Sequence, residues 1–380
     1  MTPSGRPQPG DGVDSIDTPA LVIDLDAMER NLAAMAAFTT TRGLRLRPHA
    51  KMHKSATIAR LQMAAGAIGI CVQKTSEAEA LAAVGIDDIY ISNEVVDAGK
   101  LARVAVLAGR IRLAIAVDSV EGVERLATAM AAAGTRIDVY VEVDVGHGRC
   151  GVPAAAAGAL AHRVVSHSAP EGGLRFAGLQ AYHGGAQHLR GAVERQAASQ
   201  HAAALARAAQ ASVGAAGIAC PLVTGGGTGT CSADAASGVW GELQAGSYLF
   251  MDRDYADLGW AADAPRFEHA LFVKSQVMSR ASGHAVVDAG HKAHAVDSGP
   301  PRVWQRELDY GQASDEHGVL RPHAGAMRAE LPRLGETVWL VPGHCDPTVN
   351  LHDRYVAVRG GLIAGRVEAV WPIEARGCLS

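Results

Sequence analysis

The stretch IRLAIAVDSVEGVERLATAMAAAGTRIDVYVEV, residues 111–143, decides the fold, because it places an Ala-rich helical segment between two short apolar runs. The runs at 111–117 and 137–143 have the length and β-branched content of buried strands. Residues 119–133 have the length of a helix. Parallel strands need a crossover connection, which is usually a helix. The stretch therefore predicts a βαβ unit with two parallel strands.

The same alternation extends in both directions and gives about eight βα repeats, the number that closes a TIM-type barrel of about 250 residues. Strands are predicted at 44–48, 67–72, 88–92, 111–117, 137–143, 174–181, 221–224 and 242–245. Helices are predicted at 76–84, 98–107, 119–133, 154–166 and 191–215. An open doubly wound sheet is the competing architecture. The strand count favours an α/β fold with a (β/α)8 barrel over residues 27–262.

The pattern changes near Ala264, where the Ala-rich helical stretches end. Short strand-like runs follow at 270–277, 284–287, 336–341, 354–359 and 362–370, with Gly and Pro between them. This pattern predicts a C-terminal antiparallel β domain of residues 263–380. The apolar run at 21–24 precedes the first βα unit, so residues 18–26 are assigned to the same domain. Residues 1–17, rich in Pro, Gly and Asp, are predicted to be a mobile tail and not a signal peptide.

Composition narrows the function classes. The chain has 380 residues, 48% of them hydrophobic, which is enough for a large core. A net charge of −4 and an aromatic content of 4% give no support for nucleic-acid binding. No run approaches the ~20 apolar residues of a membrane span. Six cysteines without CxxC spacing are expected to be reduced thiols, which predicts a cytoplasmic protein.

A lysine follows directly after the first predicted barrel strand, in RPHAKMHK at residues 47–54. Chemistry in such barrels lies at the C-terminal ends of the strands. A partly desolvated lysine there can form a Schiff base with an aldehyde coenzyme. A lone lysine is most often an ordinary surface residue, but the dense polar cluster around Lys51 is unusual for a surface. Lys54 is the alternative, although it is predicted to lie in the helix that follows.

The glycine-rich turn TGGGTG, residues 224–229, follows the seventh predicted strand. Glycines let backbone N–H groups converge on an anion. The phosphate site of a barrel is often built by the loops after strands seven and eight. Gly246, Ser247 and Tyr248 follow the eighth strand, as that geometry requires. A flexible glycine loop is the alternative, but the place of the turn in the strand order favours a phosphate site.

A possible metal pair stands near the C-terminus, in PGHCDPT at residues 342–348. On a strand, side chains two residues apart point the same way, so His344 and Asp346 would face one cation. A histidine with a carboxylate suits Mn²⁺, Mg²⁺ or a similar ion, whereas a thiolate from Cys345 would favour Zn²⁺. A polar turn ahead of Pro347 is the alternative.

Three further polar clusters follow strand-like runs. Residues 144–149 follow strand five and could place Arg149 near an oxygen of a coenzyme. Residues 182–188 follow strand six and contain Tyr182 and His188, and residues 315–318 of the β domain contain Asp315. Each cluster alone is more often a polar loop. Together, they predict one cleft between the two domains.

With these residues, the chain resembles the fold-type III pyridoxal phosphate enzymes, which share the alanine racemase-like barrel. Within that group, it is most similar to the family of D-threonine aldolases and 3-hydroxy-D-aspartate aldolases. The resemblance covers residues 18–377 and is strongest in RPHAK (47–51), VQKTSEA (72–78), VEVDVG (141–146), QAYHG (180–184), TGGGTG (224–229), LQAGSY (243–248) and PGHCDPT (342–348).

The resemblance assigns roles to individual positions. It implies Lys51 as the Schiff-base lysine and His344 and Asp346 as the metal ligands. It implies that His188 and Asp315 face the substrate and metal as catalytic residues. Relatives that dehydrate D-serine carry a cysteine where Asp346 stands, which favours the aldolase branch. The residues implied to contact pyridoxal phosphate are Lys51, Gln73, Arg149, Tyr182, Thr224, Gly226, Gly227, Thr228, Gly246, Ser247 and Tyr248.

The implied reaction is retro-aldol cleavage of a 3-hydroxy-D-amino acid, with D-threonine giving glycine and acetaldehyde. His188 is the predicted base for the hydroxyl proton, and a hydroxide held by the metal is the alternative. The expected metal is Mn, Mg or Co, with Zn less favoured. A homodimer is expected by analogy alone.

Four other functions stay open at this point. Cleavage of 3-hydroxy-D-aspartate to glycine and glyoxylate is hard to separate from D-threonine cleavage, although Tyr182 with His183 resembles the D-threonine branch. A metal-assisted dehydratase starts from the same bound substrate. A non-enzymatic pyridoxal phosphate carrier would lack a second domain and a metal pair, and a racemase would have no use for the metal.

Overall fold

The computed structural model describes residues 7–169, 172–325 and 330–380, and its first layer is a sheet of eight parallel strands. Their order is β2, β9, β8, β7, β6, β5, β4, β3. The sheet closes because His49, just beyond β2, forms a parallel bridge with Cys71 of β3. The predicted barrel is therefore confirmed. The strands are β2 (Arg45–Leu46), β3 (Ile70–Val72), β4 (Asp88–Ile91), β5 (Arg112–Val117), β6 (Arg136–Glu142), β7 (Gly173–Ala181), β8 (Val223–Gly225) and β9 (Glu242–Leu243).

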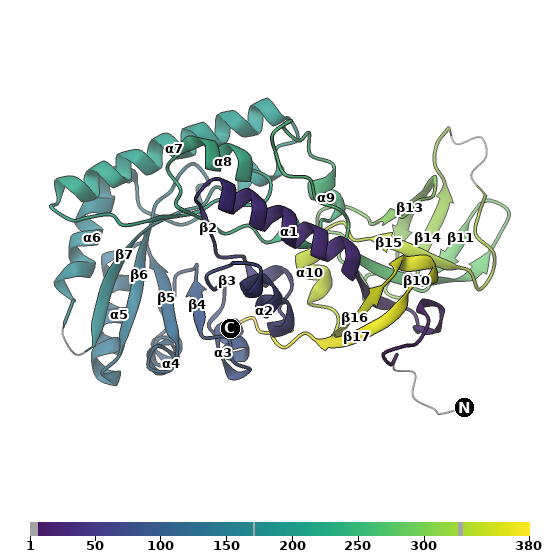
Figure 1. Cartoon of the computed structure of the whole chain (residues 1–380), viewed down its shortest axis with the longest axis horizontal. Helices are drawn as coiled ribbons and strands as arrows, with labels where there is room; N and C mark the ends of the chain where they lie inside the picture. The colour runs from purple at the N-terminus through teal and green to yellow at the C-terminus, as the bar shows by residue number, and fades with distance from the viewer. Residues whose placement is uncertain (1–6, 170–171, 326–329) are drawn as a thin grey trace.

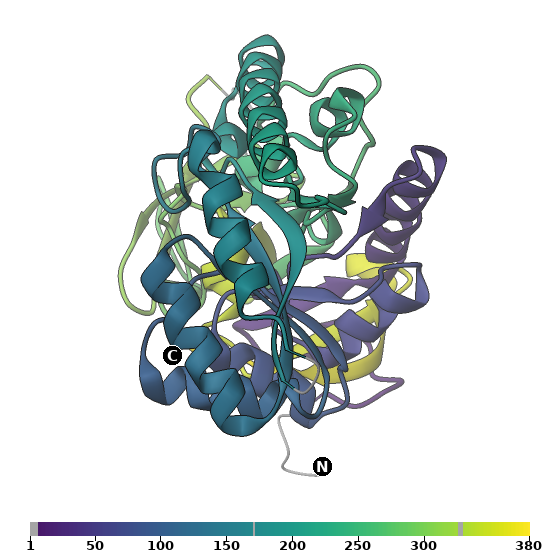
Figure 2. The ribbon, with the colours of Figure 1, turned by 90° about the vertical axis from the view of Figure 1, so that its left-hand side faces the viewer.

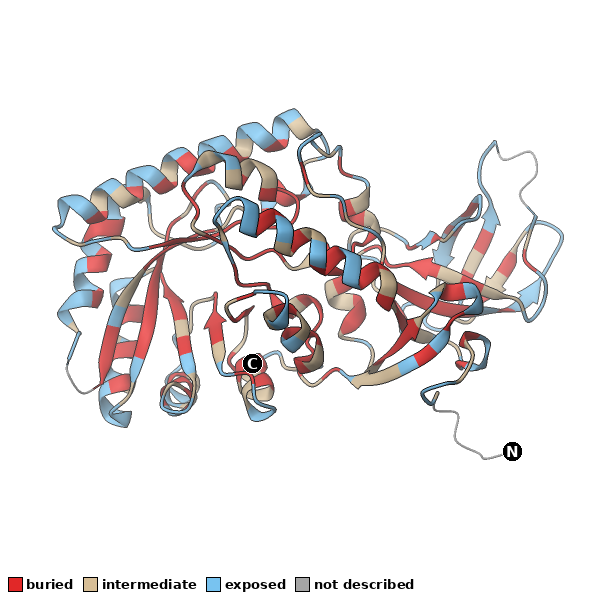
Figure 3. Ribbon diagram, viewed as in Figure 1, coloured by how far each residue is buried: buried red, intermediate tan, exposed pale blue. Residues whose placement is uncertain are grey.

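Helices surround these strands on the outside (Figures 1 and 2). In the unit that decided the fold, the Ser119 hydroxyl accepts a hydrogen bond from the Gly122 amide at the start of α5, and Gly134 ends the helix at φ 65°. The barrel helices are α1 (Leu25–Thr41), α2 (Ala56–Ala64), α3 (Thr75–Ala83), α4 (Ala98–Ala108), α5 (Val120–Ala133), α6 (Ala157–Ser166), α7 (Ala192–Ala215) and α8 (Cys231–Ser237). Their buried residues face the strands, which are buried along most of their length (Figure 3). None of the helices in the described ranges has the length and apolar character of a membrane span.

The β domain is built on a second, nine-stranded sheet, which includes the N-terminal strand β1. Its strands are β1 (Ala20–Asp24), β10 (Leu271–Arg280), β11 (Ala285–Val287), β12 (Arg302–Val303), β13 (Leu308–Ala313), β14 (Gly318–Pro322), β15 (Thr337–Val341), β16 (Arg354–Arg359) and β17 (Arg366–Pro372). All pairings are antiparallel except that of β1 with β16, which is parallel. The domain is thus antiparallel as predicted, with this one departure. The boundaries at 26 and 262 stay a prediction.

Some β-domain elements differ from the sequence prediction. Residues 362–370 were predicted as one strand, but α11 (Gly361–Ala364) occupies the start of this range and β17 begins only at Arg366. Strands β12, β13 and β14 were not predicted, because they are short and their outward faces are polar.

The segment predicted to be a mobile tail differs from that expectation in its described part. Val13 and Ile16 are 2% and 3% exposed, within a short 3-10 helix, η1 (Val13–Ser15), and just after it. The ammonium of Lys274 on β10 donates to the carbonyl oxygens of Val13 at 3.0 Å and Ile16 at 2.6 Å. Two apolar residues among Pro, Gly and Asp were enough to anchor the segment to the β domain. Residues 1–6 lie outside the described residues.

The barrel and the β domain are joined around the predicted coenzyme lysine. The Tyr355 hydroxyl on β16 donates to the carbonyl of His53 at 2.6 Å, and the end of the chain returns to α3, where the Ser76 hydroxyl donates to the Ser380 carbonyl at 2.6 Å. Lys54 was predicted to lie in a helix, but it precedes α2, with φ 53°. Its ammonium is buried against the Glu77 carboxylate at 2.5 Å. Lys54 is thus committed to a structural ion pair.

Candidate active site

The predicted site residues converge on one pocket at the C-terminal ends of the barrel strands. Residues from seven loops of the barrel and from the loop before α10 (Cys345–Val349) line it. Thr224, Gly226 and Tyr248 are buried behind this lining. The predicted residues that line the pocket are Lys51, Gln73, Arg149, Tyr182, His188, Gly227, Thr228, Gly246, Ser247, His344 and Asp346. Asp315 is the exception.

Lys51 lies in a short 3-10 helix, η2 (Ala50–Met52), directly after the first barrel strand. Its ammonium nitrogen is 3.5 Å from Oδ2 of Asp346, and its side chain is 41% exposed to the open pocket. Burial lowers the pKa of Lys51, but the Asp346 carboxylate and Tyr182 raise it by more, so the net shift is upward. The amine is therefore charged while it faces Asp346.

His49 and Gln73 form a polar wall beside Lys51. His49 Nε2 is 2.9 Å from Nε2 of Gln73 and 3.2 Å from the Ser92 hydroxyl. Burial, with the nearby Lys51 charge, lowers the pKa of His49 well below its ordinary value, so the imidazole is neutral. The backbone N–H of Gln73 donates to the Glu77 carboxylate at 2.9 Å. This hydrogen bond fixes the turn from which the Gln73 side chain projects. His49 and Ser92 were not predicted as site residues, although His49 stood in the polar cluster around Lys51.

The glycine turn has the crowding expected of an anion cradle. A Cβ on Gly227 would lie 2.4 Å from Oε1 of Gln187, and one on Gly246 would lie 2.9 Å from the His49 carbonyl. The Thr228 hydroxyl accepts the Tyr248 amide at 3.0 Å, which ties the loops after β8 and β9 together. A side chain at 227 would collide with the Gln187 side chain, and one at 246 with the His49 backbone, so glycine lets these loops pack closely against their neighbours. This arrangement fits a phosphate group.

Gln187 and Asp234 brace the glycine turn from behind. Gln187 accepts the Gly229 amide at 3.0 Å and donates to the Thr230 hydroxyl at 2.8 Å. Asp234 accepts hydrogen bonds from the hydroxyls of Ser199 and Thr230, both at 2.5 Å. Neither residue was predicted to act at the site, because each reaches the turn from a different helical segment of the chain.

His344 and Asp346 face each other, although the strand predicted for them is wrong. His344 is the N-cap of α10, and Asp346 lies in its first turn. Pro347 fits there because the first helical turn needs no donor at that position. His344 Nε2 is 3.6 Å from Oδ1 of Asp346. That oxygen is buried and accepts no hydrogen bond from the described residues, which is the arrangement a cation ligand would show.

A second carboxylate, that of Asp297, orients the metal pair. Oδ2 of Asp297 is 2.8 Å from Nδ1 of His344, which leaves Nε2 directed at Asp346. Burial lowers the pKa of His344, but Asp346 and Asp297 raise it by more. A carboxylate on the far nitrogen is the common partner of a metal-binding histidine. Asp297 was missed in the sequence because it stands 47 residues before His344.

Cys345 does not belong to the metal pair. Its side chain is buried, and its amide donates to Oδ2 of Asp252 at 3.0 Å. Burial raises the pKa of its thiol well above the ordinary value. The donor set is thus an imidazole and a carboxylate, which fits a harder divalent ion than a thiolate site would.

His188 lies at the end of a 3-10 turn, η4 (Gly185–His188), and lines the same pocket. Its Nδ1 is 2.5 Å from Oδ2 of Asp254, in the short helix α9 (Arg253–Ala256). The ring of Tyr255 is 5.9 Å away between centroids and lines the same pocket. Asp254 and Tyr255 were not predicted, because no local pattern links them to residue 188.

Asp315 is not among the residues that line this pocket. It is exposed, in the turn between β13 and β14, where its carbonyl accepts the Lys292 amide at 3.0 Å. The contact of Asp315 with substrate or metal therefore stays a prediction, because Asp315 does not line the pocket.

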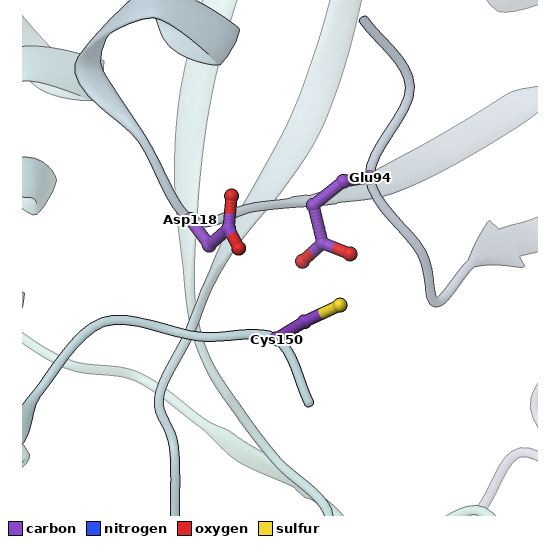
Figure 4. A group of neighbouring side chains, drawn as sticks. All are labelled: Glu94, Asp118 and Cys150. Atoms are coloured by element: carbon purple, nitrogen blue, oxygen red, sulfur yellow. The ribbon is translucent and has the colours of Figure 1, made fainter. Parts of the chain in front are cut away.

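A second polar group stands at the ends of β4 and β5. Ligand atoms of Glu94, Asp118 and Cys150 all lie within 4.8 Å of one another (Figure 4). Burial and the neighbouring Glu94 raise the pKa of the Cys150 thiol to about 11. Burial and Glu94 likewise raise the pKa of Glu142, at the end of β6, to about 9. The Cys150 thiol is therefore protonated at neutral pH, and Glu142 lies outside the cluster, which consists of two carboxyl groups and this thiol.

The fold and this site define the alanine racemase class of barrel, and comparison with known proteins agrees. The alanine racemase N-terminal domain family matches residues 23–254, and the putative serine dehydratase domain family matches residues 270–358. An alanine racemase from Clostridium difficile 630 has the same fold, with a TM-score of 0.71 at 13% identity over 94% of this chain and 99% of that one.

Three relatives narrow the family. A D-threonine aldolase from Arthrobacter sp is 48% identical over 97% of this chain and 95% of its own length. A 3-hydroxy-D-aspartate aldolase from Paracoccus denitrificans (strain Pd 1222) is 42% identical over 97% of this chain and 94% of its own. The crystal structure of D-threonine aldolase from Filomicrobium marinum superposes with a TM-score of 0.93 at 47% identity, covering all of both chains. The chain therefore belongs to the D-threonine aldolase and 3-hydroxy-D-aspartate aldolase family.

Proposed function

We propose that the chain is a carbon–carbon lyase that uses pyridoxal phosphate and a divalent metal to cleave D-threonine into glycine and acetaldehyde. One observation carries the proposal. The Lys51 amine is 3.5 Å from Oδ2 of Asp346, while Oδ1 of the same carboxylate faces His344 without a donor. The residue that would hold the coenzyme and the residues that would hold the metal thus open onto the same space.

The barrel residues fit pyridoxal phosphate, the coenzyme that the family and fold imply. Lys51 would hold the aldehyde, and the loops around Gly227, Thr228 and Gly246 would hold the phosphate. Tyr182 and Arg149 line the same pocket, with the Arg149 guanidinium 5.9 Å from the Tyr182 ring centroid. Gln73 and the neutral His49 would flank the ring of the coenzyme.

The chemistry divides between the bound groups and the chain. When bound, the coenzyme supplies an electron sink for the Cα–Cβ bonding pair, and the metal supplies a Lewis acid for the β-hydroxyl. His344 and Asp346 would hold the metal, with Mn²⁺, Mg²⁺ or Co²⁺ preferred over Zn²⁺. His188 would accept the β-hydroxyl proton, since it lines the pocket and its Nδ1 is already occupied by Asp254.

Cleavage is favoured over dehydration by the residue at position 346. The D-threo-3-hydroxyaspartate dehydratase from Delftia sp. (strain HT23) is 33% identical over 90% of this chain and 94% of its own, which is well below the aldolases. An oxygen ligand at 346 keeps the site to an imidazole and a carboxylate. A non-enzymatic carrier role would give this half-buried pair of side chains no function.

Cleavage of 3-hydroxy-D-aspartate is the second candidate, and Arg149 is the observation that favours it. A second substrate carboxylate needs a cationic partner, and Arg149 is exposed at the rim of the pocket. For D-threonine, Met52, Tyr182 and Tyr255 offer apolar surface to the methyl group. The higher identity of the D-threonine aldolase favours that substrate.

Two broader features are part of the proposal. We expect a homodimer, by analogy with fold-type III relatives that carry a β domain. We also expect a cytoplasmic protein, and the finding that all six cysteines are free thiols supports a reducing compartment.

A product assay tests the proposal. The coenzyme-loaded protein is incubated with D-threonine, L-threonine or 3-hydroxy-D-aspartate, with and without Mn²⁺. We expect glycine and acetaldehyde from D-threonine alone, and only with metal. Glyoxylate as the preferred product would move the assignment to the second candidate. Formation of 2-oxobutyrate and ammonia would show a dehydratase, and no turnover of any substrate would favour the carrier.

A further inference from the structure

We infer that Asp254 is a positioning residue that fixes the imidazole of His188 with its proton on Nδ1, so that Nε2 is the acceptor nitrogen presented to the substrate. The inference rests on the proposed function, because it gives His188 the part of the base. It adds a residue that no pattern in the sequence links to the site.

The side chains of Asp254 and His188 are in close contact, and only the Asp254 side chain is buried. Oδ2 of Asp254 is 2.5 Å from Nδ1 of His188. The Asp254 side chain is 5% exposed, whereas the His188 side chain is 49% exposed and lines the pocket. The ring is thus held at one nitrogen by a buried group, and the rest of it faces the pocket.

Asp254 is ionised, and that decides the tautomer. Burial raises its pKa, but the hydrogen bond to His188 and the charge of Arg190 lower it by more, so the net shift is downward. A carboxylate can only accept hydrogen bonds, so Nδ1 of a neutral His188 must be the donor. The lone pair then resides on Nε2. A base needs that lone pair on the pocket side.

The carboxylate is itself held by a second partner. Arg190 donates from Nη2 to Oδ1 of Asp254 at 2.5 Å and from Nη1 to its backbone carbonyl at 2.5 Å. Because the Arg190 guanidinium binds both the side chain and the backbone of Asp254, Oδ2 of Asp254 has little freedom to move. Oδ2 therefore stays aimed at His188.

The same short helix is tied to the loop that carries the metal pair. The Asp254 amide donates to the Gly343 carbonyl at 3.2 Å, and the Arg253 amide donates to the Pro342 carbonyl at 3.0 Å. Gly343 immediately precedes His344. Asp254 thus fixes the base through its side chain and the metal loop through its backbone. Asp254 is therefore one of the residues, with Asp252 and Arg253, that set the spacing between the base and the metal ligands.

A purely structural ion pair between Arg190 and Asp254 is the simpler alternative. It would stabilise α9 without setting the tautomer of His188. The two readings differ in the protonated nitrogen of His188 and in how substitutions at 188 and 254 combine.

The experiment is ¹⁵N NMR of the coenzyme-loaded protein, labelled in the histidine rings, with His188→Gln to identify the signals of His188. We expect Nδ1–H in the wild type and a shift toward Nε2–H in Asp254→Asn, because the new amide can donate to Nδ1. A wild-type His188 that is neutral with its proton on Nε2, or a tautomer that Asp254→Asn leaves unchanged, would overturn the inference. This readout stands even if D-threonine is not the substrate, and failure of the proposed function would show separately as absent glycine in the product assay.

Kinetics give the second readout. We expect Asp254→Asn to lower kcat for D-threonine by about 100-fold, within the range of a general base, with KM nearly unchanged. In the His188→Gln background, the same substitution should cause little further loss. Arg190→Gln removes the guanidinium that holds Asp254 but leaves the carboxylate that sets the tautomer of His188, so it should reduce kcat by less than about tenfold and by less than Asp254→Asn does. Equal losses in Arg190→Gln and Asp254→Asn, or additive losses with His188→Gln, would support the structural ion pair and overturn the inference.

Discussion

The coenzyme half and the metal half of the site are held in different ways. Lys51 and the glycine turn stand at the ends of barrel strands, where the hydrogen-bonded sheet fixes their places. His344 and Asp346 belong to no strand. Their loop is held by hydrogen bonds to Asp252, to the amides of Arg253 and Asp254, and to the Asp297 carboxylate. The coenzyme half is built into the fold, whereas the metal half depends on a few contacts between domains. Single substitutions should separate the two halves.

The largest effect is expected at Lys51. In Lys51→Ala, the visible absorbance band of the lysine-bound coenzyme should vanish, and activity should be lost, because no amine remains to hold the aldehyde. Metal binding, measured by calorimetry, should persist. Lys51→Arg is the matched control that keeps the charge beside Asp346 but cannot form the bond. A retained band in either variant would move the assignment to another lysine.

The converse effect is expected at Asp346. Asp346→Ala removes one of two protein ligands and should lower Mn²⁺ affinity by more than the ~10- to 100-fold that outer partners contribute. Activity should fall with it, while the coenzyme band remains. Asp346→Asn keeps the shape of the side chain and should weaken metal binding less than Asp346→Ala does. Simultaneous loss of coenzyme and metal would show that the halves are one folding unit and would break the comparison.

Asp297→Asn probes the orientation of the metal histidine. The amide cannot fix His344 as the carboxylate does, so Mn²⁺ affinity should fall by about 10- to 100-fold. The coenzyme band should not change, since Asp297 contacts only the metal half. Asp309→Asn is a control, because Asp309 likewise pairs with a histidine, His323, but on the exposed surface. An equal effect of the two substitutions on metal affinity would argue against the role of Asp297.

Gly227→Ala tests the coenzyme half by crowding. The new Cβ would lie 2.4 Å from Oε1 of Gln187, so the braced turn must shift. Overpacking of this kind costs about 1–3 kcal/mol, so coenzyme affinity should fall by roughly 5- to 150-fold if the whole cost falls on the bound state. Gly214→Ala, in α7 with open space around it, is the matched control and should leave coenzyme binding unchanged. Unchanged coenzyme affinity in Gly227→Ala would remove the glycine turn from the phosphate site.

The smallest effect is expected at Cys345. Because its thiol is buried away from the pair, Cys345→Ala should leave Mn²⁺ affinity and metal preference nearly unchanged. The free energy of unfolding should fall by about 1 kcal/mol, as for a small loss of buried volume. A marked loss of Zn²⁺ affinity with this variant would instead make the thiol a ligand.

These two halves also differed in how far the sequence could predict them. The barrel strands and five of their helices were predicted within a few residues, because those βα units carry their own pattern of apolar and Ala-rich runs, whereas α1, α2 and α8 were given no bounds. Lys51 and the glycine turn were found from their positions in that strand order. His344 and Asp346 were found as a pair, but their helix was mistaken for a strand, since Pro347 suits a first helical turn as well as a turn after a strand.

Residues that act through tertiary contacts could not be predicted. Asp254 and Asp297 reach their histidines across 66 and 47 positions of the chain. Lys54 was expected to be helical, and only the structure shows it buried against Glu77. Asp315 was expected to face the substrate; it lies in an exposed turn and is not among the residues that line the pocket, so its role stays a prediction. A single sequence gives the order of elements, whereas these side chains depend on how the two domains meet.

Anomalous diffraction from crystals loaded with Mn²⁺ and the coenzyme tests most directly whether both groups occupy one pocket. We predict one strong manganese peak between Nε2 of His344 and Oδ1 of Asp346, and coenzyme density continuous with the Lys51 amine. A manganese peak at Glu94, Asp118 and Cys150 with none at His344, or coenzyme density joined to another lysine, would contradict the account.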